Sequence, residues 1–120
     1  MGVITQDAIN AATCGTVLFI NNIYNYIIDL NYKYKCNRNL PHKKAALFHF
    51  VGLTKPWHTW SIFYEECSPF KVAKLSSPWR DEPLISPRTK NNYKYAAKHL
   101  RFNGLYLKSI INYLQYKVMS

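Results

Sequence analysis

A short apolar run that ends at a glycine and leads into a lysine, a proline and a tryptophan constrains the fold more than any other feature of the sequence. The run, residues 45–51, has the length of a buried strand, and His49 lies within it. Gly52 follows, where the missing Cβ lets the phosphate groups of a ligand approach the main chain. Lys55 supplies the point charge that a diphosphate would need, and Trp57 supplies a rigid flat surface. The pattern indicates a strand that ends at a phosphate- and metal-binding corner.

The same residues also allow a plainer interpretation. In it, the segment is only a strand, a turn and a surface lysine, with His49 hydrogen-bonded inside a core. The spacing of the residues does not separate the two interpretations.

The pattern H-x-x-G-x-x-K-P-W after an apolar strand resembles the C-terminal motif of family 8 glycosyltransferases, the bacterial lipopolysaccharide glucosyl- and galactosyltransferases. The resemblance implies that His49 helps to hold a divalent metal, Mn²⁺ or Mg²⁺, and that Gly52 and Lys55 contact the diphosphate of a UDP-sugar. It also implies an enzyme that transfers a hexose from UDP-glucose or UDP-galactose to a lipopolysaccharide core sugar, with retention at the anomeric centre.

A second segment near the start of the chain carries a weaker resemblance. Residues 5–10, T-Q-D-A-I-N, are similar to the family's D-Q-D-x-x-N segment, which makes Gln6 and Asp7 candidates beside the reacting carbon. Thr5 stands where the family has an aspartate, so one carboxylate that would bind sugar hydroxyls or orient the site is missing. The segment also suits the start of a capped helix.

Segments of the tail resemble the C-terminal extension of the lipopolysaccharide branch: S-P-W-R at 77–80, K-H-L at 98–100, Gly104 and Y-L-Q-Y at 113–116. The resemblance, from residue 5 to about 117, implies an α/β class: the C-terminal portion of a GT-A type glycosyltransferase, with few short strands and a C-terminal helical extension. Residues 1–60 would form the end of the catalytic domain and residues 61–120 the basic extension.

The family's D-x-D motif, which binds the metal and UDP, has no counterpart in this sequence. We therefore expect an incomplete metal site and a C-terminal fragment that is inactive alone. The remaining ligands would come from a separate N-terminal chain or be absent.

Outside the motif, periodicity and the positions of proline and glycine predict a series of elements. They are a helix over residues 5–14, a strand over 16–20, an irregular stretch over 21–39, a helical turn within 57–67, a proline-punctuated connection over 68–87, and helices over 89–102 and 105–118. The last two helices carry apolar faces, made of Tyr93, Ala96, Ala97 and Leu100 on the first and Leu107, Ile110, Ile111, Leu114 and Val118 on the second.

The chain is strongly basic, with 16 lysines and arginines against 6 acids, and no acid follows Glu82. On the helix over 89–102, Lys94, Lys98 and Arg101 lie opposite the apolar face with tyrosines beside them. Such a surface suits an anionic membrane, where each cation contributes about 1 kcal/mol. The resemblance places a lipid-anchored, phosphorylated acceptor there, although a simple solvated face fits the pattern too.

These features predict a cytoplasmic protein, peripheral on the inner membrane. No apolar run approaches the ~18 residues of a membrane span, and the start lacks the pattern of a secretory signal. The three cysteines form no C-x-x-C pair, which indicates reduced, ordinary thiols.

The alternative class is a basic, aromatic-rich nucleic-acid-binding module. Positive charge and 19 aromatic residues, with a patch such as Tyr32-Lys33-Tyr34-Lys35, would suit backbone contacts and base stacking. No nucleic-acid-binding motif is present, and this alternative leaves the histidine, glycine and lysine unexplained. We therefore expect no nucleic-acid partner.

Overall fold

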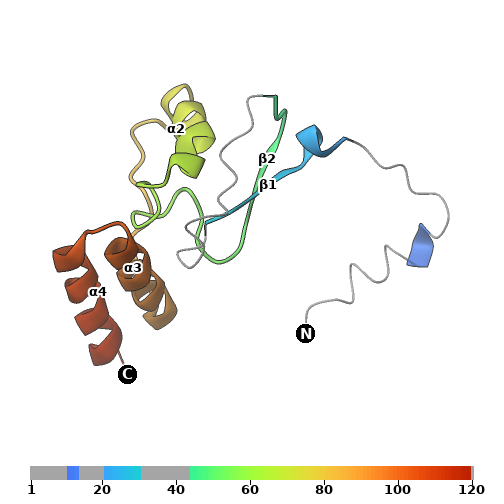
Figure 1. Cartoon of the computed structure of the whole chain (residues 1–120). Helices are drawn as coiled ribbons and strands as arrows, with labels where there is room; N and C mark the ends of the chain where they lie inside the picture. Colours follow the sequence, from blue (N-terminus) through green and yellow to red (C-terminus); the bar gives the residue numbers. More distant parts are fainter. Residues whose placement is uncertain (1–10, 14–20, 31–43, 120) are drawn as a thin grey trace.

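The computed structural model describes residues 11–13, 21–30 and 44–119 (Figure 1). These residues form a mixed fold of a small parallel sheet and helices, as the α/β class predicted. The sheet consists of β1 (Tyr26–Asp29) and β2 (Phe48–Val51), and the helices are α2 (Ser68–Leu75), α3 (Lys90–Phe102) and α4 (Tyr106–Val118). Single-turn 3-10 helices, η1 (Asn22–Tyr24) and η2 (Glu65–Cys67), precede β1 and α2.

One face of the sheet packs into the core, and the other carries His49. Ile27 pairs with His49 and Asp29 pairs with Val51, and strand alternation puts these four on one face. The other face packs into the core with Leu30, Tyr64, Cys67 and Phe102; its members are Tyr26, Ile28, Phe48 and Phe50. His49 is therefore held by a half-buried strand and stands on the exposed side of it.

The prediction of a strand within 45–51 is confirmed for Phe48–Val51. The expectation of an irregular stretch over 21–39 is wrong where η1 and β1 form. Four residues give too short a pattern to mark a strand locally, and β1 gains its hydrogen bonds from β2, which lies about twenty positions later. The expected helix over 5–14 and strand over 16–20 fall almost wholly outside the described residues.

The connection predicted over 68–87 contains a helix that the prolines did not suggest. Pro69 occupies the first turn of α2, where its missing N–H has no partner to lose, so it begins the helix instead of breaking it. After α2, the chain returns across the loop that follows β2: Ile85 N donates to Trp57 O at 2.9 Å, and Thr59 N donates to Ile85 O at 3.0 Å. The helical turn expected within 57–67 is present as η2.

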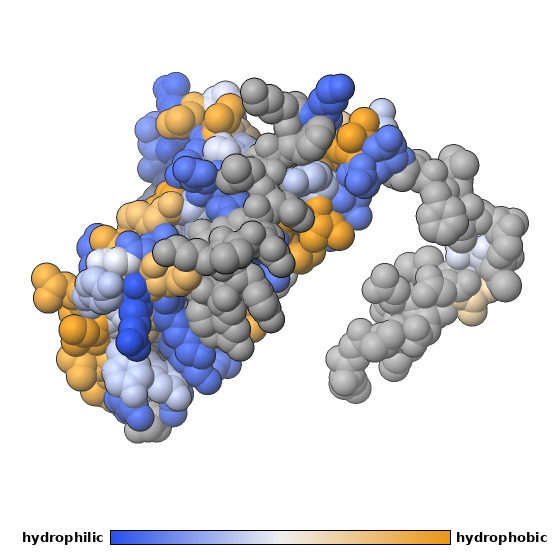
Figure 2. All heavy atoms as spheres, viewed as in Figure 1, coloured by the Kyte–Doolittle hydropathy of each residue, from blue (hydrophilic) through white to orange (hydrophobic). Residues whose placement is uncertain are grey.

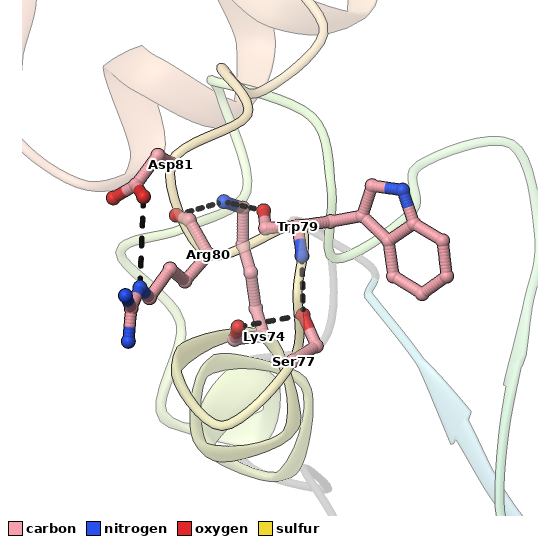
Figure 3. Close-up of polar contacts among 5 residues, drawn as sticks. All are labelled: Lys74, Ser77, Trp79, Arg80 and Asp81. Atoms are coloured by element: carbon pink, nitrogen blue, oxygen red, sulfur yellow. Dashed lines mark hydrogen bonds and ion pairs between the residues drawn. The ribbon is translucent and has the colours of Figure 1, made fainter.

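The S-P-W-R segment forms a turn held by α2 (Figure 3). Lys74 Nζ donates to the carbonyl oxygens of Trp79 and Arg80, at 3.0 and 2.6 Å. Ser77 Oγ donates to Lys74 O at 2.8 Å, and Arg80 forms an exposed ion pair with Asp81. The Trp79 ring points away from the turn and is 68% exposed.

The two C-terminal helices are confirmed and pack against each other as a hairpin (Figure 1). Thr89 caps α3, because its Oγ1 accepts from Asn92 N at 3.2 Å. Gly104, with φ of 78°, makes the turn, and Ser109 Oγ donates to Ala97 O at 2.7 Å across the hairpin. No helix among the described residues is long and apolar enough to cross a membrane.

The predicted apolar stripe of α4 exists, but it is not buried within the described structure. Its members are Leu107, Ile110, Ile111, Leu114 and Val118, each more than half exposed. Figure 2 shows hydrophobic side chains along the outer edge of α4. The matching stripe of α3 is buried at Ala96, Ala97 and Leu100, as its periodicity predicted.

Candidate functional site

The predicted metal ligand His49 is oriented by a neighbouring amide. His49 Nδ1 lies 3.0 Å from Asn25 Oδ1, at the end of η1. Because an amide oxygen only accepts, Nδ1 donates in this contact, and in the neutral ring the lone pair is then on Nε2. This is the tautomer that a metal-binding histidine needs, with its other nitrogen fixed by a second residue.

Gly52 occupies the turn at the end of β2 with φ of 79°, a conformation that other residues rarely adopt. A Cβ there would lie 2.9 Å from Asp29 Oδ1. The turn thus requires glycine for its backbone conformation, and the exposed Asp29 side chain would have to turn aside to admit a Cβ. The turn also brings the Asp29 carboxylate to the corner beside the face that carries His49.

Lys55 reaches back over this turn. Its Nζ donates to Phe50 O at 2.6 Å, so the ammonium group lies beside the end of β2. The structure thus places the Lys55 ammonium group beside the Gly52 turn, at the end of β2, whereas the His49 ring lies against Asn25, directly before β1. Gln6 and Asp7 lie outside the described residues.

The loop around Lys55 is held by its neighbours. Lys55 N donates to His58 Nδ1 at 3.1 Å, and Ser61 Oγ donates to Lys55 O at 2.5 Å. The His58 ring stacks on Trp60, with centroids 4.2 Å apart. Burial and the charge of Lys55 lower the pKa of His58 below its usual 6.5, which agrees with an Nδ1 that accepts.

A buried histidine joins this loop to α3. His99 is 1% exposed, and its Nε2 lies 2.8 Å from Thr54 Oγ1. Its Nδ1 lies 2.7 Å from Tyr64 OH, and Trp60 Nε1 donates to Thr54 Oγ1 at 3.5 Å. His99 belongs to the K-H-L segment that resembles the family, but nothing local in the sequence reveals a partner 45 positions away.

The described residues do not complete a metal site. Across residues 11–13, 21–30 and 44–119, no three histidine, cysteine or acidic side chains come together in a way that could hold an ion. His49 Nε2 therefore fits as a single ligand. Cys67 is no candidate, since burial raises its pKa to about 11 and its thiol donates to Ser61 O at 3.3 Å.

The three basic residues predicted to face a membrane or acceptor line a groove between α3 and α4, with a volume of about 550 Å³. Lys94, Lys98 and Arg101 come from α3 and line the groove together with Ala97, so the expectation that they lie opposite the apolar face is wrong and they border it instead. The other helix, α4, contributes Tyr106, Ile110, Tyr113 and Tyr116. No acid lines this groove, so it combines apolar surface with one sign of charge.

The sequence profile of "Glycosyl transferase family 8" matches residues 1–61, and that of "Glycosyl transferase family 8 C-terminal" matches residues 64–119. The chain belongs to glycosyltransferase family 8. The resemblance inferred from His49, Gly52 and Lys55 is thereby confirmed. Members of this family are typically metal-dependent.

Similar family members act on lipopolysaccharide. The chain is 37% identical to lipopolysaccharide glucosyltransferase WaaO of Escherichia coli (strain K12), over 92% of this chain and 33% of that protein. It is 37% identical to lipopolysaccharide 1,3-galactosyltransferase of Salmonella typhimurium (strain LT2), over 90% of this chain and 32% of that protein. It is 32% identical to lipopolysaccharide 1,2-glucosyltransferase of Escherichia coli (strain K12), over 88% of this chain and 32% of that protein.

The chain thus spans about a third of the length of the curated relatives it matches. No solved structure matches it. Its two family matches meet near residue 62, so the Thr54–His99 contact joins the part matched by the first profile to the part matched by the second.

Proposed function

We propose that the chain acts in hexosyl transfer from UDP-glucose or UDP-galactose to a lipopolysaccharide core sugar, with the donor's diphosphate bound at the Gly52–Lys55 corner. The observation that carries this is the position of Lys55 Nζ, held at 2.6 Å from Phe50 O beside a turn with no Cβ. A diphosphate at this turn would meet the ammonium group of Lys55. The Asp29 carboxylate occupies the space beside Gly52, so the diphosphate would bind on the side of Lys55.

In this proposal, Lys55 stabilises the negative charge that develops on the leaving diphosphate. A bound Mn²⁺ or Mg²⁺ would add Lewis-acid stabilisation, with His49 Nε2 as one ligand and the others from outside the described residues. Gln6 and Asp7 remain the candidates beside the reacting carbon. Residues 1–60 would be the end of a GT-A catalytic domain and residues 61–120 its basic extension.

Both parts of the chain match a glycosyltransferase family, which favours this function over a nucleic-acid-binding module. A lipopolysaccharide acceptor provides another anionic partner for the positive charge.

Calorimetric titration with UDP, with and without Mn²⁺ and at moderate salt, tests donor binding. We expect saturable binding that strengthens with Mn²⁺, is lost in Lys55→Ala and loses its metal dependence in His49→Ala. Lys108→Ala removes the same charge from an exposed site on α4 and serves as the control. Equal affinity for Lys55→Ala and Lys108→Ala would overturn the proposal, as would a folded wild type that does not bind UDP.

We also propose that the α3–α4 hairpin attaches the protein to the cytoplasmic face of the inner membrane. The exposed apolar stripe of α4 and the cations Lys94, Lys98 and Arg101 support this, since interfacial helices combine apolar burial with attraction to anionic lipids. Sedimentation with vesicles tests it. We expect binding to vesicles containing phosphatidylglycerol and little to pure phosphatidylcholine; replacing the three cations by glutamine should abolish the difference.

A further inference from the structure

We propose that His99 is a positioning residue for donor binding, which ties α3 to residues 52–61 and thereby fixes the backbone that carries Lys55. This inference rests on the proposed function of the corner. It assigns a role to a side chain that lies behind the loop and does not itself reach the ligand.

The histidine is placed as a bridge. Its two ring nitrogens lie 2.7 Å from Tyr64 OH and 2.8 Å from Thr54 Oγ1. A neutral imidazole has one donor and one acceptor, so both hydroxyl partners are held in defined directions. All three residues are at least 96% buried, which makes an unpaired polar atom costly and the arrangement specific.

Thr54 is the residue directly before Lys55, so its position sets where the Lys55 side chain begins. The side after Lys55 is held separately: Pro56 is buried, and Ser61 Oγ donates to Lys55 O and to His58 O. His99 therefore secures one end of the lysine-bearing backbone, and residues of the loop itself secure the other. Small displacements of a charge-stabilising group reduce its effect strongly, so the bridge should matter for donor affinity.

Three variants and one control separate positioning from general stability. His99→Ala removes both contacts, His99→Gln restores a side chain that can donate and accept, and Tyr64→Phe removes one hydroxyl. Ser109→Ala is the control, because it deletes a buried hydrogen bond to Ala97 O in the same hairpin without touching the loop.

The first measurement is hydrogen exchange of the amides in residues 52–61. We expect exchange to be roughly tenfold faster in His99→Ala, the effect of losing a buried hydrogen bond, and unchanged in Ser109→Ala. His99→Gln should lie between His99→Ala and wild type. Should His99→Ala fail to fold, Tyr64→Phe, which keeps the imidazole, gives the decisive comparison with Ser109→Ala.

The second measurement is UDP affinity in the same variants. We expect roughly tenfold weaker binding in His99→Ala, partial recovery in His99→Gln and wild-type affinity in Ser109→Ala. Faster loop exchange with unchanged UDP affinity in His99→Ala would overturn the inference. An equal loss of UDP affinity in His99→Ala and Ser109→Ala would also overturn it. If loop exchange is faster only in the His99 and Tyr64 variants and the wild type does not bind UDP, the proposed function is refuted. His99 would then be only a residue that holds the loop.

Discussion

At the scale of single residues, Gly52 is the position where conformation and space act together. Its φ of 79° disfavours any side chain, and a Cβ would lie 2.9 Å from Asp29 Oδ1. We expect Gly52→Ala to lower the free energy of unfolding by about 1 to 2 kcal/mol, mostly from the backbone conformation, because the exposed Asp29 side chain can turn away from the added Cβ. Urea unfolding measures the change.

Gly104 provides the matched control, because its φ is 78° and a Cβ added there would meet nothing within 4 Å. Gly104→Ala should therefore cost only the conformational part, about 1 kcal/mol. Equal losses for the two variants would show that the contact with Asp29 has no energetic consequence.

His58 should make stability depend on pH. Burial and Lys55 lower its pKa in the folded protein, so the unfolded chain takes up a proton first as the pH falls. The folded state should lose stability from about pH 6.5 downward, until the pH passes the lowered pKa. Unfolding of wild type and His58→Asn across this range should give curves that diverge below about pH 6.5, with the variant falling less. Parallel curves would exclude the role of His58.

The sequence predicted part of the candidate site at this scale. His49, Gly52 and Lys55 lie within seven positions of the sequence and carry a recognisable motif, so the family could be inferred from them. The roles of Asn25 and His99 could not be predicted, because their partners, His49 and Thr54, lie 24 and 45 positions away in the sequence. Such pairs depend on strand pairing and helix packing that no local pattern encodes.

At the scale of elements, long periodic segments with caps were predictable and short ones were not. The helices α3 and α4 have 13 residues each, Thr89 caps α3, and a glycine turn separates the two. β1 has four residues and takes its register from β2, and α2 begins at a proline that resembled a breaker. Length and tertiary pairing explain the difference.

The two helices of the hairpin should respond differently to loss of a leucine. Leu100 of α3 is 5% exposed, whereas Leu114 of α4 is 58% exposed. We expect Leu100→Ala to cost about 2 to 5 kcal/mol and Leu114→Ala less than about 0.5 kcal/mol, measured by urea unfolding.

The Leu114→Ala variant also tests the membrane proposal. Leu114→Ala should weaken binding to phosphatidylglycerol vesicles although it leaves the fold intact. A large loss of stability in Leu114→Ala would mean that the apolar stripe of α4 is buried in the protein in solution, which would contradict its role at a membrane.

At the scale of the whole molecule, the parts matched by the two family profiles form one connected structure. Tyr64 and Cys67 belong to the core beneath β1 and β2, and His99 reaches Thr54. The family could be inferred from a motif in the sequence, whereas this connection required coordinates. It means that the basic C-terminal helices and the loop that carries Lys55 share buried contacts.

The most direct test of donor binding at this corner is a titration of ¹⁵N-labelled protein with UDP and Mg²⁺, followed residue by residue in NMR spectra. We expect saturable shifts centred on Gly52, Lys55 and the Trp60 indole N–H, and none of comparable size at Lys94 or Lys98. Shifts spread over the basic face of α3, with an unchanged signal from Gly52, would show that UDP is attracted only by charge and would contradict the account.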